Sequence, residues 1–234
     1  MERMETRDYR LERWLAVLLS LLFFLPFVAK ADDILFANVS YHGDEMPYRN
    51  GEEFLALTHD GVLAPVRIQV KREHDPIVDN EGEVTGKHVA VPGFEEYTLL
   101  LRGRKLNPGK VVLAEPDSLE LEAGVTKATI ALGRTTSHVY YRCSDTECTF
   151  VLETGGVSQD LFTVEAERRG KEIFAGDLSH AISVAGDFDH DGKLDLVMNA
   201  ATHWNESRPT LFLSTSAKGG KLVGKAAEIV MTGC

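Results

Sequence analysis

The sequence predicts a mainly β protein, and three observations support this. Short apolar or alternating segments recur along the chain, turn-forming residues separate them, and no stretch of ten or more residues has the pattern of an amphipathic helix. We expect a sandwich-like N-terminal part followed by a β-rich part that carries one Asp-rich loop.

The individual strands are expected where apolar residues cluster between turns. Val66 to Lys71 alternates apolar and polar residues with a period of two, as a half-buried strand does. Asp60-Gly61 predicts a turn before it, and a helix is expected only near Ser216 to Ala227. The other expected strands are short and largely apolar: residues 34–39, 54–58, 97–101, 111–114, 127–132 and 138–142.

A domain boundary is expected near Gly133 to Ser137, because Val111 to Leu132 resembles the closing strands of a small sandwich. This gives an N-terminal β-rich domain over residues 32–134 and a C-terminal β-rich domain over residues 135–234. The alternative is that the two parts share one core.

Residues 1–31 have the pattern of a secretory signal peptide. An Arg-containing start precedes the uncharged stretch from Trp14 to Val28, and Ala29-Lys30-Ala31 is a small-x-small cleavage pattern. Fifteen helical residues extend about 22 Å, which is short of the ~30 Å hydrocarbon core of a membrane. We therefore expect cleavage before Asp32, no membrane span in the mature chain, and a periplasmic or secreted location.

The charge of the chain argues against nucleic acid as a partner. The whole chain carries −11, and the leader, with five basic and four acidic residues, contributes +1, so the remainder carries −12. The sequence has no basic stripe that would neutralise phosphates.

The three cysteines lie at positions 143, 148 and 234. Cys143 and Cys148 flank a four-residue loop between two expected strands, so we predict a disulfide across a hairpin. Cys234 is left unpaired in this arrangement, although pairing with one of the other two is the alternative.

The segment Asp187-Phe188-Asp189-His190-Asp191-Gly192-Lys193-Leu194-Asp195 carries the most specific chemical signal. Calcium takes six to eight oxygen ligands, and alternate aspartates on a tight loop supply them. We expect the carboxylates of Asp187, Asp189, Asp191 and Asp195 and the carbonyl of Lys193 to bind Ca²⁺. Gly192 permits the sharp turn. A helix-loop-helix calcium site would need a Glu at Met198 and helical flanks, and neither is present.

The residues from Ala185 to Val197 resemble an FG-GAP repeat of the integrin-alpha type, called VCBS-like in bacteria. The resemblance covers roughly residues 174–216, where Thr210 to Ser214 is similar to the strand that follows the loop in that family. It implies calcium bound between strands. A propeller needs several blades, whereas Ala175-Gly176-Asp177-Leu178 begins like a second repeat but lacks the acids, so a complete propeller is not expected.

The sequence thus predicts an exported calcium-binding β protein that acts as a non-enzymatic binding or structural module. A secreted hydrolase with a structural calcium ion is the alternative, since sequence does not exclude a triad assembled by the fold. A carbohydrate or protein ligand is a further possibility, because Trp204 lies in a polar segment, placed beside the calcium site in this interpretation, and suits stacking on a sugar. The acidic segment from His74 to Glu83 is interpreted as a solvated loop.

Overall fold

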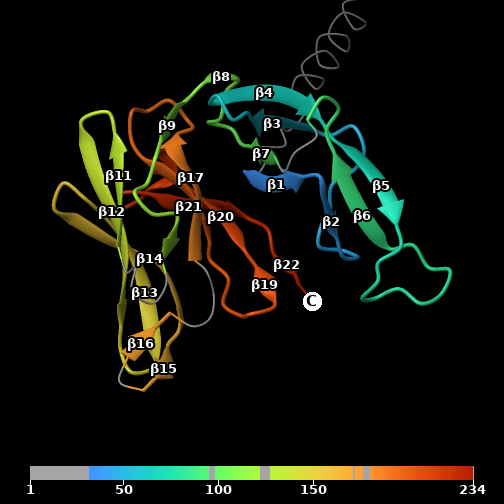
Figure 1. Cartoon of the computed structure of the whole chain (residues 1–234). Helices are drawn as coiled ribbons and strands as arrows, with labels where there is room; N and C mark the ends of the chain where they lie inside the picture. The colour runs from blue at the N-terminus through green and yellow to red at the C-terminus, as the bar shows by residue number, and fades with distance from the viewer. Residues whose placement is uncertain (1–31, 95–97, 122–126, 171, 176–179, 234) are drawn as a thin grey trace, which may run out of the picture. The chain divides into compact units, whose positions relative to one another are not determined.

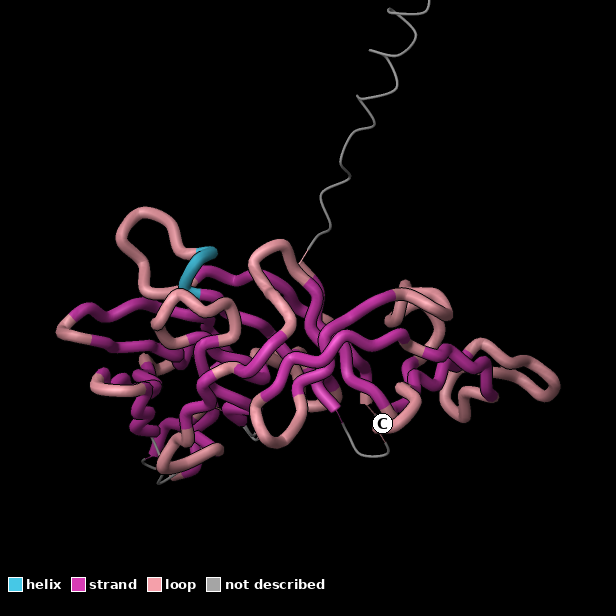
Figure 2. The backbone as a smooth tube through the Cα atoms, turned by 90° about the horizontal axis from the view of Figure 1, so that it is seen from above, coloured by secondary structure: helices cyan, strands magenta, loops and turns pink. Residues whose placement is uncertain are grey.

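The computed structural model describes residues 32–94, 98–121, 127–170, 172–175 and 180–233. The expected signal peptide and the partial second repeat at residues 176–178 lie outside these residues. The mainly β prediction is confirmed, because strands and loops make up the described chain apart from one 3₁₀ turn, η1 (Ser214–Ser216) (Figure 2). Among the described residues, no helix has the length and apolarity to cross a membrane.

The first sheet is built from residues in the N-terminal half. Its strand order is β1-β7-β3-β4-β8, and all neighbours are antiparallel. The expected turn at Asp60-Gly61 joins β3 to β4, where Gly61 has a φ of 75°. The strands are β1 (Asp33–Ala37), β3 (Glu53–Leu57), β4 (Val62–Arg67), β7 (Thr98–Arg102) and β8 (Gly109–Lys110).

The second sheet lies in the middle of Figure 1 and has the order β10-β17-β18-β20-β21, with β9 also paired to β17. Because β9 and β10 come from the N-terminal half, both halves of the chain contribute to this sheet. The strands are β9 (Val112–Ala114), β10 (Glu120–Leu121), β17 (His180–Asp187), β18 (Asp195–Asn199), β20 (Pro209–Leu213) and β21 (Gly224–Glu228).

The third sheet is an antiparallel meander of four strands in the order β11-β12-β13-β14. It consists of β11 (Lys127–Leu132), β12 (Thr135–Cys143), β13 (Glu147–Thr154) and β14 (Val157–Glu165). Three small sheets complete the fold: β2 (Val39–Tyr41) with β6 (Gly86–Ala90) and β5 (Gln69–Glu73), β15 (Glu167–Arg169) with β16 (Glu172–Phe174), and β19 (Glu206–Ser207) with β22 (Met231–Thr232).

The second sheet is buried on both faces. In β18, Val197 packs into a first core shared with the first sheet, whereas Leu196 and Met198 pack into a second core shared with the third sheet. In β20, Leu211 lies in the first core and Phe212 in the second. Since successive side chains of a strand point to opposite faces, a strand between two cores must be apolar at every position. This accounts for the unbroken apolar runs in both strands.

Residues 31–234 form one compact unit. The expected boundary between residues 134 and 135 falls in the turn of the β11–β12 hairpin, where Leu132 pairs with Thr135. The two cores instead lie on opposite faces of the shared second sheet. None of the described sheets closes into a barrel or a propeller.

Two details of the expected strands and helix are wrong. The expected strand from Val66 to Lys71 is broken at buried Ile68, so β4 and β5 belong to different sheets. No α-helix forms over 216–227: η1 ends at Ser216, and β21 occupies the end of the segment. Gly219 and Gly220 there have φ values of 62° and 80°, which are incompatible with a right-handed helix. The acidic segment His74 to Glu83 lies in the β5–β6 loop, as expected, but the side chains of Asp75 and Asp79 are buried and not solvated.

Cys143 and Cys148 are joined by a disulfide across the turn between β12 and β13, where they are cross-strand partners, as predicted. Their sequence separation is 5, so the closed loop is short. A loop of this size constrains the unfolded chain by only about 2 kcal/mol. We expect reduction to lower the free energy of unfolding by that amount or less and to leave the protein folded. Urea unfolding with and without reductant measures this, and complete unfolding on reduction would contradict it.

Candidate metal centre

The Asp-rich loop connects two adjacent strands of the second sheet. β17 ends at Asp187 and β18 begins at Asp195, and Gly186 pairs directly with Asp195. The chain therefore leaves and re-enters the sheet at neighbouring points, which brings the first and last aspartates together. Between them, His190 and Gly192 have φ values of 62° and 79°, and this left-handed backbone closes the loop tightly.

The base of the loop is fixed by packing on both faces of the sheet. Phe188 is fully buried in the first core, and Leu194 is buried in the second. Gly186 lies so close to β9 that a Cβ atom there would be 2.7 Å from the carbonyl oxygen of Val112. The loop that carries the aspartates is consequently anchored in both cores.

Three carboxylates meet inside the loop. Asp187, Asp189 and Asp195 each offer an oxygen, and these oxygens all lie within 4.8 Å of one another. Asp195 has no exposed surface, and Asp187 and Asp189 are 8% and 9% exposed. This cluster can hold a metal ion, because close buried carboxylates repel one another unless a cation compensates them.

The carboxylate of Asp191, a fourth expected ligand, takes another position. Asp191 is not among the three clustered carboxylates, and its Oδ1 accepts the N–H of Lys193 at 2.9 Å. Its Oδ2 lies 3.5 Å from the Lys193 ammonium, which extends into solvent. The structure thus brings together three of the four expected aspartates.

Backbone N–H groups orient two of the clustered carboxylates. The two oxygens of Asp187 accept the N–H groups of Asp191 and Gly192, each at 3.0 Å. Asp195 Oδ2 accepts the N–H of Phe188 at 2.8 Å, and its Oδ1 accepts the N–H of Ser214 at 2.7 Å. Asp195 therefore joins the loop to the end of β20, which is a distant segment of the chain.

Burial dominates the electrostatics of Asp195. The pKa of this carboxyl is raised to about 7, mainly because burial removes the charged form from water; the N–H of Ser214 acts in the opposite direction, and the neighbouring charge of Asp189 acts in the same direction as burial. A bound cation would favour the ionised carboxylate and remove this effect.

One carboxylate oxygen at this site, Oδ1 of Asp189, is buried without a hydrogen-bond partner. The Ser214 hydroxyl lies beside the Asp195 carboxyl and lowers the pKa of that group. The other oxygen of Asp189 accepts the hydroxyl of Thr215, and Ser214 lies beside Asp195 through its N–H. Buried polar atoms are nearly always partnered, so an unpartnered carboxylate oxygen within a carboxylate cluster indicates a missing electropositive partner. The donor set, consisting of oxygens alone, fits a hard divalent cation.

Ser214 and Thr215 were missed by the sequence reasoning. They follow β20 and are 19 and 20 residues beyond Asp195, and no spacing rule connects them to the loop. Their place at the site follows from the pairing of β18 with β20, in which Leu196 is opposite Phe212.

The structure places Trp204 away from this centre, not beside it. β18 runs from Asp195 at the loop to Asn199, and Trp204 follows Asn199 in the chain, so about 13 Å of strand separates the two ends. The indole is 71% exposed. Trp204 and the Asp-rich loop therefore lie at opposite ends of the second sheet. The expectation that they share one surface is wrong.

A serine, a histidine and a carboxylate also meet on β2, β6 and β5, which bears on the hydrolase alternative. Ser40 Oγ lies 3.4 Å from His88 Nδ1, but the Ser40 hydroxyl is also hydrogen-bonded to Glu73. In a catalytic triad the carboxylate holds the second ring nitrogen of the histidine. Here Glu73 accepts a hydrogen bond from the serine instead, so the three residues do not have the hydrogen-bond arrangement of a catalytic triad.

No protein-family model, characterised protein or solved structure matches this chain. The most specific chemical feature of the chain is the buried cluster of carboxylate oxygens in the loop between β17 and β18.

Proposed function

We propose that this chain is an exported β protein that binds one calcium ion in the 187–195 loop and acts as a non-enzymatic binding or structural module. The observation that carries this proposal is the unpartnered Oδ1 of Asp189 within three buried carboxylates. The resemblance of the loop to an FG-GAP repeat supports the same ion.

Calcium suits this donor set better than magnesium does. Asp187, Asp189 and Asp195 supply carboxylate oxygens, and the Ser214 hydroxyl is a neutral oxygen at the same place. Rotation of Asp191 and the carbonyl of Lys193 would complete the set that the loop pattern predicts. Calcium accepts such an irregular shell of six to eight oxygens, whereas magnesium requires a near-octahedral shell and releases its waters reluctantly.

The ion would stiffen the second sheet. Its ligands come from the β17–β18 loop, and two of them contact the Ser214–Thr215 corner that leads from β20 toward β21. A cation at the centre therefore connects three neighbouring strands at one end of the sheet. Since both cores pack on this sheet, the effect reaches the whole molecule.

Isothermal titration calorimetry of metal-stripped protein tests the proposal. We expect one calcium ion per chain, with magnesium binding more weakly, and no calcium binding by Asp189→Asn, which keeps the size of the side chain and removes its charge. Asp145→Asn is the matched control, because Asp145 is 85% exposed in a surface ion pair. The absence of calcium binding to the wild-type chain would refute the proposal.

Export is supported by the leader pattern and by the Cys143–Cys148 disulfide, since disulfides persist in oxidising compartments. We expect the protein isolated from its host to begin at Asp32, the residue after the small-x-small pattern. Mass spectrometry of the intact protein measures this. A cytosolic protein that retains residues 1–31 would contradict export.

A further inference from the structure

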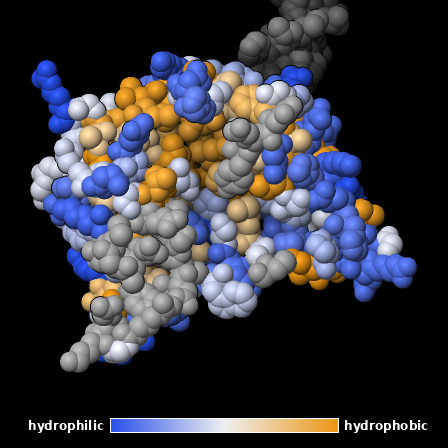
Figure 3. All heavy atoms as spheres, in the orientation of Figure 1, coloured by the Kyte–Doolittle hydropathy of each residue, from blue (hydrophilic) through white to orange (hydrophobic). Residues whose placement is uncertain are grey.

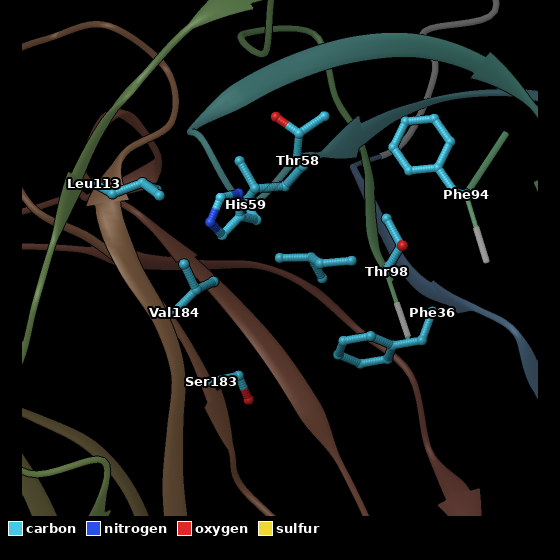
Figure 4. A pocket seen from close by; sticks show the side chains of 10 residues that line it. Phe36, Thr58, His59, Phe94, Thr98, Leu113, Ser183 and Val184 are labelled. Carbon is cyan, nitrogen blue, oxygen red and sulfur yellow. The ribbon is translucent and has the colours of Figure 1, made fainter. Parts of the chain in front are cut away.

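An apolar cavity lies between the first and second sheets, apart from the carboxylate cluster. Its volume is about 460 Å³, which is within the range of small-molecule sites. Figure 3 shows apolar side chains gathered over the upper middle of this face, and Figure 4 shows the cavity from close by. Ten residues line it: Phe36, Leu57, Thr58, His59, Phe94, Thr98, Leu99, Leu113, Ser183 and Val184.

The described residues of the lining are mainly apolar and include no carboxylate, lysine or arginine. Its inner surface is formed by side chains such as Phe36 and Leu99, which are 3% and 8% exposed. A molecule with several charges would lose its hydration here without gaining a partner of opposite charge.

Two exposed residues with polar side chains line the cavity. His59 lies in the turn between β3 and β4 of the first sheet, and Ser183 lies on β17 of the second sheet. Figure 4 shows His59 and Ser183 on the same side of the cavity as Val184, with Phe94 and Thr98 across from them. The Thr58 hydroxyl is already bonded, because it accepts the N–H of Val62 at 3.0 Å and contacts Asp60.

The walls are held in place by contacts outside the cavity. Both backbone polar atoms of Phe36 are hydrogen-bonded to the Tyr41 hydroxyl at 2.9 Å. The turn that carries His59 packs against β9, where a Cβ atom on Gly61 would lie 3.2 Å from Leu113 Cγ. A site whose walls are already ordered loses little conformational freedom when a ligand binds.

We propose that this cavity binds a small, uncharged and mainly apolar molecule whose polar end is hydrogen-bonded by His59 and Ser183. The volume sets the size of the ligand, the uncharged lining sets its polarity, and the two exposed polar groups set its orientation. This site is separate from the calcium centre, and the proposal does not depend on calcium binding.

Fluorescence titration with the neutral probe N-phenyl-1-naphthylamine tests the proposal on the full mature chain. We expect saturable binding to the wild type and binding weaker by about tenfold or more for Ser183→Phe, whose ring would enter the cavity mouth. Ser158→Phe is the matched control, because Ser158 is an exposed serine on β14 in the third sheet. Thermal melting confirms that both variants are folded.

The anionic probe 1-anilinonaphthalene-8-sulfonate tests the polarity of the site. We expect it to bind more weakly than the neutral probe. Non-saturable binding of the neutral probe, equal binding by the Ser183→Phe variant and the wild type, or tighter binding of the anionic probe would each overturn the proposal.

Discussion

Calcium at a hundredfold excess over its Kd is expected to raise the melting temperature by about 5–10 °C. Binding to the folded state alone at this excess stabilises it by about 2.7 kcal/mol, and each kcal/mol corresponds to roughly 2–4 °C for a chain of this size. The physical cause is the compensation of three buried carboxylates that repel one another. Differential scanning calorimetry with calcium and with a chelator measures the shift.

Variants locate the origin of this shift. Asp187→Ala and Asp189→Asn should abolish it, because each removes a charged ligand from the cluster. Asp79→Ala should retain it, since the Asp79 carboxylate accepts the N–H groups of Asp75 and Thr85 within the β5–β6 loop and has no part in the centre. If Asp79→Ala lost the shift and the loop variants kept it, the ion would belong to the N-terminal half.

The metal-free protein is expected to lose stability as the pH rises from about 4 to about 7. The folded-state pKa of Asp195 is raised to about 7 by burial, whereas an unfolded aspartate titrates near ~3.9. Between these values the folded state binds more protons than the unfolded state, so the free energy of unfolding falls with pH. The loss is complete above the folded pKa and amounts to at most about 4 kcal/mol.

This loss has two controls. In Asp195→Asn the side chain carries no charge at any pH, so the slope due to this group should disappear, whereas the exposed-site variant Asp145→Asn should keep it. Calcium should also remove the slope, because the ion favours the ionised carboxylate. The stabilisation by calcium should therefore be larger at pH 8 than at pH 5. Urea unfolding across this range measures both effects, and a calcium effect independent of pH would contradict the pKa assignment.

Local patterns were sufficient where the structure depends on neighbouring residues. The strand segments, the turn at Asp60-Gly61 and the disulfide hairpin at Cys143 and Cys148 follow from alternation, turn residues and short spacing. The Asp-rich loop could likewise be predicted from the sequence, because its first and last aspartates flank a tight turn between adjacent strands. Asp191 differs from the expectation, since its carboxylate is not among the three that cluster.

The pairing of strands from distant parts of the chain could not be predicted from the sequence, and this pairing determined the architecture. The apolar run at Leu196 to Met198 predicts a buried strand but does not say which sheets cover its two faces. The break at Ile68 depends on a contact with Glu52, whose carbonyl accepts the N–H of Ile68 at 3.0 Å. Such contacts join residues that no sequence period connects.

The sequence alone determined the chemistry of the molecule: a β-rich chain with a leader pattern, a disulfide hairpin and an Asp-rich loop. The tertiary structure decided what surrounds that chemistry. It placed Ser214 and Thr215 against the loop, separated Trp204 from it, and opened the cavity between two sheets. The physical reason is that turns and strand alternation arise from local backbone geometry, whereas coordination shells and cavities are formed by segments that meet only when sheets pack.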